Sequence, residues 1–172
     1  MNTATSSKLL RLFIFRHCRS LPQGFLTTDG IERSRRLGAA LRLNDRINYS
    51  KNSIVLCSGG LNGQLDPRTL PTRLTAQWVV STLDAKPEIR PCPELFADDK
   101  VCDVDAAIRL LENIAAYFEN IIVVSHVNMV KHFPREFGRQ VLGVDDFPSA
   151  HVEYGQGYAI GCDRPSCQFF KY

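Results

Sequence analysis

The chain has 172 residues, 44% of them hydrophobic and 23% charged, with a formal net charge of +3. This length suits one well-buried domain, so we expect a single domain over residues 9–172 and a flexible tail at residues 1–8. The charge is too small to indicate nucleic acid as a partner, and no apolar run approaches the length of a membrane span. The six cysteines form no C-x-x-C pair, which predicts free thiols in a cytoplasmic protein.

The first regular pattern is the apolar, aromatic segment at residues 9–15, which predicts a strand buried on both faces. A helix is expected from its cap at Thr28 or Asp29 to about residue 43. Glu32 stands three residues after Asp29, as a capping box requires.

The middle of the chain continues the alternation of strands and helices. Residues 54–57 predict a second buried strand. A loop rich in Gly, Asn and Pro then leads to a helix over about residues 72–83. Residues 89–95 predict an edge strand, because Pro91 and Pro93 have no N–H group for a central ladder.

The last third of the chain opens with an amphipathic helix over residues 103–118. A fully apolar strand follows at residues 121–124. A helix is expected over about residues 129–141, kinked or restarted at Pro134. Residues 157–172 predict one or two short strands around a turn.

Strands that alternate with helices indicate an α/β fold, here a three-layer sandwich with a mostly parallel central sheet flanked by helices. In such sheets, ligands bind beyond the carboxyl ends of the strands. Two apolar strands end in polar clusters, which consist of Arg16, His17, Arg19 and Ser20 after the first strand and Ser125 and His126 after the late one.

The residue types in these two clusters suit a phosphoryl group. Arginine presents a fork of N–H donors that matches phosphate oxygens. A neutral imidazole can attack phosphorus, and a second imidazole can donate to the oxygens on which charge develops. Neither His17 nor His126 lies on an apolar helix face, where a core histidine would be the default. The pattern therefore predicts a phosphoryl-transfer site.

Four segments resemble, in order, the motifs of the histidine phosphatase (phosphoglycerate mutase-like) superfamily. Residues 16–20 resemble R-H-G-x-[ST], residues 26–30 match L-T-x-x-G, Thr75-Ala76 resembles the T-A pair, and residues 123–126 resemble V-x-S-H. The resemblance extends from residue 9 to about residue 132. The chain has no large inserted cap and looks most like the compact phosphohistidine phosphatase branch.

This resemblance implies a phosphoglycerate mutase-like fold and a phosphatase that needs neither metal nor cofactor. It implies that His17 becomes phosphorylated and that Arg16 and His126 contact the phosphoryl group. Arg19, Ser20 and Ser125 are expected to help bind the substrate. The implied substrates are phosphorylated small molecules or phosphoproteins, phosphohistidine among them.

A further arginine of the pocket stays open between two residues. The family places it four residues before T-A, where this chain has Pro71. Arg73 is nearest and is our choice, and Arg68 is the alternative.

The general acid is also open. Ala97 stands where larger family members have glutamate, and Asp98 or Asp99 can substitute for it. A leaving group of low pKa needs little protonation, so the reaction can also proceed without a protein acid. We favour Asp98.

Two departures from the motifs bear on activity. Cys18 and Val127 replace glycines, and the Cys18 side chain is expected to crowd the pocket with a redox-sensitive thiol. These changes leave open a weakened member that only binds phosphorylated ligands. A phosphoglycerate mutase-type phosphotransferase is a separate alternative. The histidines and cysteines lack the paired spacing of a metal site. Cys162 and Cys167 are close enough in sequence to bridge across a turn.

Overall fold

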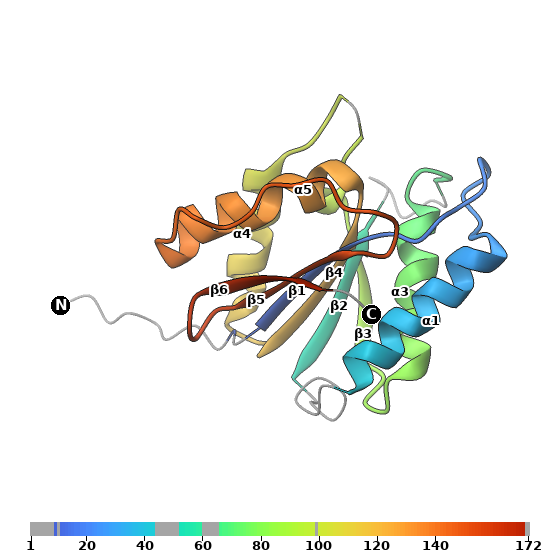
Figure 1. The fold of residues 1–172 in the computed structure, drawn as a ribbon, viewed down its shortest axis with the longest axis horizontal. Helices are drawn as coiled ribbons and strands as arrows, with labels where there is room; N and C mark the ends of the chain where they lie inside the picture. The colour runs from blue at the N-terminus through green and yellow to red at the C-terminus, as the bar shows by residue number, and fades with distance from the viewer. Residues whose placement is uncertain (1–8, 10, 44–51, 60–65, 99, 171–172) are drawn as a thin grey trace.

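The computed structural model describes residues 9, 11–43, 52–59, 66–98 and 100–170. The tail expected at residues 1–8 and the alternative acid Asp99 lie outside these described residues. The described chain forms a six-stranded sheet (Figure 1), whose strands are β1 (Arg11–Arg16), β2 (Ser53–Ser58), β3 (Glu88–Cys92), β4 (Asn120–Ser125), β5 (Gly157–Gly161) and β6 (Ser166–Phe170).

The strand order is β3-β2-β4-β1-β5-β6. The first four strands in this order pair in parallel, and β5 and β6 add an antiparallel hairpin beside β1. The mostly parallel sheet expected from the sequence is confirmed. β3 lies at the edge, as its proline required, and it pairs only with β2 among the described strands.

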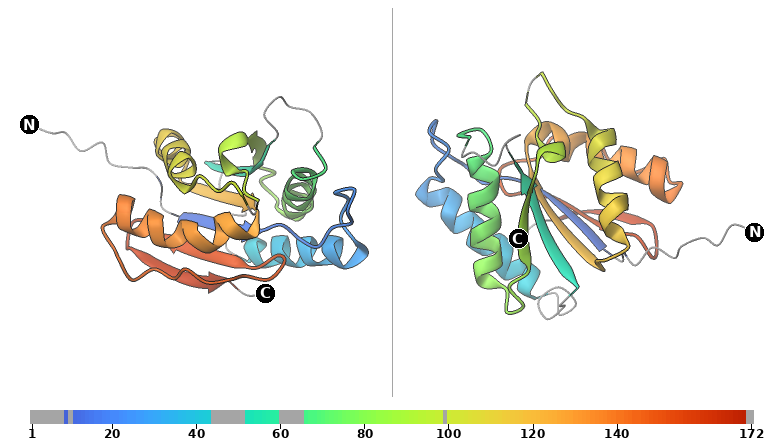
Figure 2. Two further views of the ribbon diagram at one scale, coloured as in Figure 1. Left: turned by 90° about the horizontal axis from the view of Figure 1, so that it is seen from above. Right: turned by 180° about the vertical axis from the view of Figure 1, so that it is seen from behind.

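Helices cover both faces of the sheet (Figure 2). The helices are α1 (Thr28–Arg42), α3 (Leu70–Thr82), α4 (Val104–Ala115) and α5 (Val127–Phe137), with a 3₁₀ turn η1 (Pro93–Leu95) and a π-helical turn η2 (Gly138–Leu142). α1 packs against α3 on one face, and α4 packs against α5 on the other. None of the described helices combines the length and apolarity needed to cross a membrane.

The central strands divide the core into two layers, because successive side chains of a strand point to opposite faces. In β1, Leu12 and Ile14 join the core under α4 and α5, whereas Phe13 and Phe15 join the core under α1 and α3. β2 and β4 alternate in the same way. The continuous apolar runs of the sequence therefore mark strands buried on both faces.

Helix α1 begins at Thr28, and its cap lies one residue before the first of the two expected caps. Thr27, rather than Thr28 or Asp29, caps it: its side-chain oxygen accepts the N–H of Gly30 at 3.0 Å. Glu32 pairs with Arg36 instead of completing a capping box. A Cβ on Gly30 would meet a backbone oxygen at 2.1 Å, so only glycine allows the helix start to lie this close to the loop after β1.

Helix α5 begins at Val127, two residues before the expected start. The chain stays helical through Pro134 and changes to the π-helical turn at Gly138. Because α5 begins directly after His126, the carboxyl end of β4 connects to a helix without an intervening loop. This short connection fixes where His126 can lie.

Candidate active site

The register of the sheet brings the two histidines together. Arg16 is opposite Ser125 at the ends of the parallel strands β1 and β4, and the N–H of His17 donates to the carbonyl of Ser125 at 2.9 Å. The ring centroids of His17 and His126 are 5.4 Å apart, and the rings meet nearly edge to face at 72°. The expected juxtaposition of the two histidines is present.

A cavity of about 250 Å³ opens at this edge of the sheet. Its lining includes four of the residues expected in the site, namely Arg16, His17, His126 and Asp98, and also Arg68, Phe96, Ala97, Val127 and Asn128. The volume suits a phosphoryl group with part of its leaving group, and the lining combines cations with an aromatic ring.

His17 is held in one tautomer. Its Nδ1 donates to the carbonyl of Cys18 at 2.8 Å, since a carbonyl oxygen can only accept. The proton is therefore on Nδ1, and the lone pair is on Nε2. Burial lowers the pKa of His17, and the nearby Arg16 adds to this effect against the hydrogen bond to Cys18. The neutral ring is the nucleophilic form.

His126 is also neutral at physiological pH. Burial, followed by the neighbouring His17, lowers the pKa of His126 to about 4. Its Nε2 is buried and has no hydrogen-bond partner. A buried polar atom without a partner is costly, so this nitrogen marks a place where a ligand would restore a hydrogen bond.

Arg16 is fixed from two sides. Its Nη1 donates to the carbonyl of Val152 at 2.9 Å, and its guanidinium lies 3.8 Å from the ring centroid of Tyr154. Its Nε is buried and unpartnered. Arg16 and His126 thus both line the cavity, and each has a buried nitrogen without a partner, as expected of a site built for an anion.

The structure places Arg68, not Arg73, in the cavity lining. Arg68 lies in the turn before α3, pairs with Asp66 at 2.8 Å and reaches to 5.2 Å from the ring centroid of Phe96. Arg73 is exposed on α3 and outside the cavity, and its charge acts instead on the thiol of Cys57. Counting from the T-A pair favoured Arg73, but the cation that reaches the cavity comes from the turn.

Asp98 lines the cavity, but its carboxylate is engaged in a turn. Its Oδ1 accepts the backbone N–H groups of Lys100 and Val101, each at 2.8 Å. These hydrogen bonds lower the pKa of Asp98, so the carboxyl is ionised and poorly suited to donate a proton. Ala97, which also lines the cavity, presents only a methyl group.

Asn128 also lines the cavity, although no motif marks it. Its side-chain amide donates to the backbone carbonyl of Asp98 at 2.9 Å. This contact ties the start of α5 to the segment after η1. The two walls of the cavity are thereby linked.

Three residues expected to bind substrate lie outside the cavity lining. Ser125 is buried, and its hydroxyl donates to the carbonyl of Leu95 at 2.5 Å. Ser20 forms a bridge with Leu26, and the side chain of Arg19 is exposed. The backbone of Arg19 has a structural role instead, because its carbonyl accepts the N–H of Thr27 at 3.0 Å.

Cys18 does not crowd the cavity. Its side chain is fully buried, and its thiol lies beside the hydroxyls of Ser34 and Thr75. Its backbone N–H donates to Thr75 Oγ1 at 3.0 Å, so the threonine of the T-A pair supports the loop after His17. Burial raises the pKa of the Cys18 thiol, which disfavours the reactive thiolate.

The remaining cysteines and histidines do not assemble into a second centre. Cys162 and Cys167 are free thiols at the two sides of the β5–β6 turn. Within the described ranges, no group of three or more His, Cys, Asp or Glu side chains could hold a metal ion. His132 and His151 are exposed.

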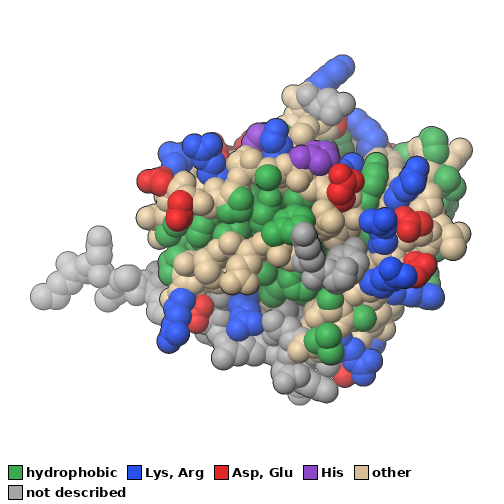
Figure 3. All heavy atoms as spheres, in the orientation of Figure 1, with side chains coloured by type: hydrophobic (Ala, Val, Ile, Leu, Met, Phe, Trp, Pro, Cys, Tyr) green, Lys and Arg blue, Asp and Glu red, His purple; other side chains and the backbone are tan. Residues whose placement is uncertain are grey.

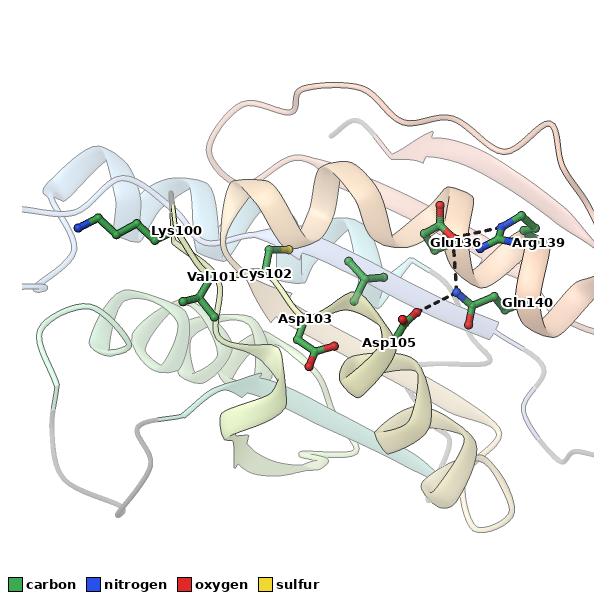
Figure 4. A pocket seen from close by; sticks show the side chains of 9 residues that line it. Lys100, Val101, Cys102, Asp103, Asp105, Glu136, Arg139 and Gln140 are labelled. Carbon is green, nitrogen blue, oxygen red and sulfur yellow. Dashed lines mark hydrogen bonds and ion pairs between the residues drawn. The ribbon is translucent and has the colours of Figure 1, made fainter.

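A second hollow of about 530 Å³ lies between α4 and α5 and shares no lining residue with the first cavity. Figure 4 shows that four of its polar side chains bond to one another: Gln140 bonds to Asp105 at 2.9 Å, and Arg139 pairs with Glu136 at 2.6 Å. On the face shown in Figure 3, charged side chains of both signs are interspersed. Within the described part of the chain, the unsatisfied buried nitrogens belong to Arg16 and His126, which line the first cavity, so that cavity is the candidate active site.

Neither a protein-family model nor a curated protein sequence gives a significant match to the chain. Solved structures do match it over nearly its whole length. The protein histidine phosphatase SixA, solved with tungstate, superposes with a TM-score of 0.66 at 18% identity, covering 94% of this chain and 95% of that one.

Two other matches extend the comparison. The ecdysone phosphate phosphatase of Bombix mori, also solved with tungstate, has a TM-score of 0.64 at 12% identity and covers 92% of each chain. The phosphoglycerate mutase of Bacillus anthracis has a TM-score of 0.61 at 14% identity, covering 98% of this chain and 94% of that one. The chain therefore shares the phosphoglycerate mutase-like fold of these solved structures, as the sequence motifs predicted.

Proposed function

We propose that the chain is a phosphatase that transfers a phosphoryl group from its substrate to His17 Nε2 and then to water. One observation carries the proposal. His17 is held with its proton on Nδ1 by the 2.8 Å hydrogen bond to Cys18, and the cavity residues beside it, Arg16 and His126, each have a buried nitrogen without a partner. The nucleophile and its oxyanion donors thus occupy one cavity.

In the first step, the lone pair of His17 Nε2 attacks phosphorus. The Nε2–P bond forms as the bond from phosphorus to the leaving-group oxygen or nitrogen breaks, and the leaving group keeps the electron pair and takes a proton from solvent. Arg16 and Arg68 neutralise charge on the phosphoryl oxygens, and His126 donates an N–H to one of them. The buried imidazole needs no general base, because it is already neutral.

In the second step, water attacks phosphorus as the Nε2–P bond breaks. Inorganic phosphate leaves, one water proton passes to solvent, and His17 returns to its neutral form. Arg16, Arg68 and His126 can supply the positive charge and donors that a metal would otherwise provide, so we expect the reaction to be independent of metal ions. The proposed substrates are phosphomonoesters or phosphoproteins, phosphohistidine among them, and the proposed location is the cytoplasm.

The test is hydrolysis of para-nitrophenyl phosphate at mildly acidic pH with EDTA and reductant present. The wild type and His132→Ala should turn over equally, because His132 is exposed and outside the cavity. His17→Ala should lose activity by at least about 1,000-fold, as expected when a nucleophile is removed. Acid-labile, alkali-stable phosphate should be trapped on the wild type and not on His17→Ala.

Two outcomes would contradict the proposal. Activity that survives in His17→Ala would exclude the phosphohistidine step. A folded wild type that binds tungstate without turnover would instead indicate a binding module for phosphorylated ligands.

A further inference from the structure

Tyr154 lies against both residues at the centre of the candidate site, although it belongs to no motif. Its ring centroid is 3.8 Å from the guanidinium carbon of Arg16 and 5.6 Å from the ring centroid of His17. It precedes β5, in a segment without helix or strand. The position of this ring therefore depends on how that segment is attached to the end of β1.

The segment is attached by its backbone. The N–H of Gly155 points to the carbonyls of Arg16 at 3.1 Å and His17 at 3.3 Å, and the N–H of Arg16 donates to the carbonyl of Gln156 at 2.9 Å. Gly155 has a φ of +77°, a left-handed conformation that favours glycine. Tyr154, directly before this glycine, is thus held at a fixed height over Arg16.

Arg16 contacts the Tyr154 ring and the carbonyl of Val152 with different parts of its guanidinium group. The Tyr154 ring covers one face of the guanidinium, while Nη1 donates in its plane to the carbonyl of Val152 at 2.9 Å. The Nε of Arg16 is buried and has no hydrogen-bond partner among the described residues. A guanidinium held by its face and one edge presents its other edge to phosphate oxygens without having to be ordered on binding.

We propose that Tyr154 is a positioning residue that acts through Arg16 to set the affinity of the cavity for phosphoryl groups. The ring, rather than the hydroxyl, carries this role, since the aromatic face makes the contact with the cation. The inference rests on the proposed function in that the bound group is taken to be a phosphoryl group.

The experiment compares Tyr154→Phe, Tyr154→Leu and Tyr154→Met in the full chain, with Tyr117→Leu as the matched control. Tyr117 is 72% exposed and precedes β4, at the end of that strand away from the cavity. Tungstate affinity is measured by calorimetry, and kcat and KM are measured with para-nitrophenyl phosphate. Two variants without the ring are used so that one can still test the proposal if the other fails to fold.

We expect Tyr154→Phe and Tyr117→Leu to stay within about twofold of the wild type. Tyr154→Leu and Tyr154→Met should weaken tungstate binding by about 2- to 30-fold, the range of a cation–π contact, and lower kcat/KM by a similar factor. In an Arg16→Ala background, removing the ring should cause no further loss of tungstate affinity. A merely structural role would give the same loss with or without Arg16.

Three results would overturn the proposal: wild-type tungstate affinity in both ring-lacking variants, a loss in Tyr154→Phe as large as in Tyr154→Leu, or a loss that persists undiminished in Arg16→Ala. Tungstate binding does not require turnover. If the wild type binds tungstate without hydrolysing the ester, the proposed function fails, and the Tyr154 variants still decide the inference. If the ester is hydrolysed and ring removal changes nothing, only the inference fails.

Discussion

His17 and His126 lie edge to face, with ring centroids 5.4 Å apart, and His17 helps to lower the pKa of His126. Burial is the larger cause for both rings and lowers the pKa of each from its ordinary value. The pair therefore enters the reaction uncharged. A bound phosphoryl dianion would raise the pKa of His126, because a nearby negative charge favours the protonated form of the ring.

The lowered pKa of His17 predicts the pH dependence of kcat/KM, which reports groups of the free enzyme. The nucleophile is the neutral ring, so activity should persist as pH falls through 6.5, the ordinary value, and decline only below it. The measurement is kcat/KM for para-nitrophenyl phosphate from pH 4 to 8, corrected for ionisation of the substrate phosphate. An acidic limb with its midpoint at 6.5 or higher would contradict the burial of His17.

The pKa of His126 predicts a loss of stability in acid. The unfolded chain binds a proton below about pH 6.5 and the folded chain only near pH 4, so the unfolded state holds more protons in this window. The free energy of unfolding should thus fall as pH falls, by about 3 kcal/mol from His126 between pH 7 and pH 4.

Urea unfolding at pH 7 and pH 4 checks this value against His126→Asn. The asparagine variant cannot bind the proton, so its stability should drop by about 3 kcal/mol less than that of the wild type over the same range. Ionised carboxylates such as Asp98 contribute equally to both proteins and cancel in the difference. Equal drops in the two proteins would show that His126 is not buried as a neutral ring.

The sequence was sufficient for the sheet and for the two histidines, because both follow from local patterns. Continuous apolar runs identified the central strands, and parallel strands bring their carboxyl ends to one edge. The same reasoning did not anticipate that Ser125 lies outside the cavity lining. Alternate residues of a strand share a face, so Ser125 lies on the same side of the sheet as Val123, the side covered by α4. Its hydroxyl donates there to the carbonyl of Leu95.

The sequence was insufficient wherever the site depends on long-range packing. Arg16 and Val152 bond although they are 136 residues apart, and no motif marks Val152 or Tyr154. The second arginine was assigned by its distance from Thr75, which assumes that the family's helix start is preserved. Here α3 begins at Leu70, and the turn before it brings Arg68 to the cavity.

Arg68 and Arg73 give a direct test of that assignment. Arg68→Ala removes a cation from the cavity lining and should lower kcat/KM for para-nitrophenyl phosphate by about 10- to 100-fold, as expected for one charge-assisted hydrogen bond to phosphate. Arg73→Ala removes an exposed charge and should change it by less than about twofold. A large loss in Arg73→Ala with little change in Arg68→Ala would identify Arg73 as the pocket arginine.

The environment of Asp98 predicts that this residue does not act as the general acid. Asp98→Asn keeps an oxygen that can accept the N–H groups of Lys100 and Val101, so the turn should survive. Because its carboxyl is already ionised in the folded protein, we expect less than about a threefold change in kcat/KM, for both para-nitrophenyl phosphate and phenyl phosphate. A much larger loss on phenyl phosphate, whose leaving group needs protonation more, would identify Asp98 as the acid.

We predict that thiol reagents do not modify Cys18 in the folded protein, although Cys18 is next to the nucleophile His17 in the sequence. The side chain is fully buried against Ser34 and Thr75, and burial raises the pKa of its thiol, so little thiolate forms and reagents cannot reach it. Native protein treated with an aromatic disulfide reagent should keep its activity, and peptide mapping should find Cys18 unmodified until urea is added. Cys18→Ala should retain activity within about threefold, because Thr75 still accepts the backbone N–H of residue 18. Inactivation that follows modification of Cys18 in the folded protein would instead place the thiol within reach of the cavity.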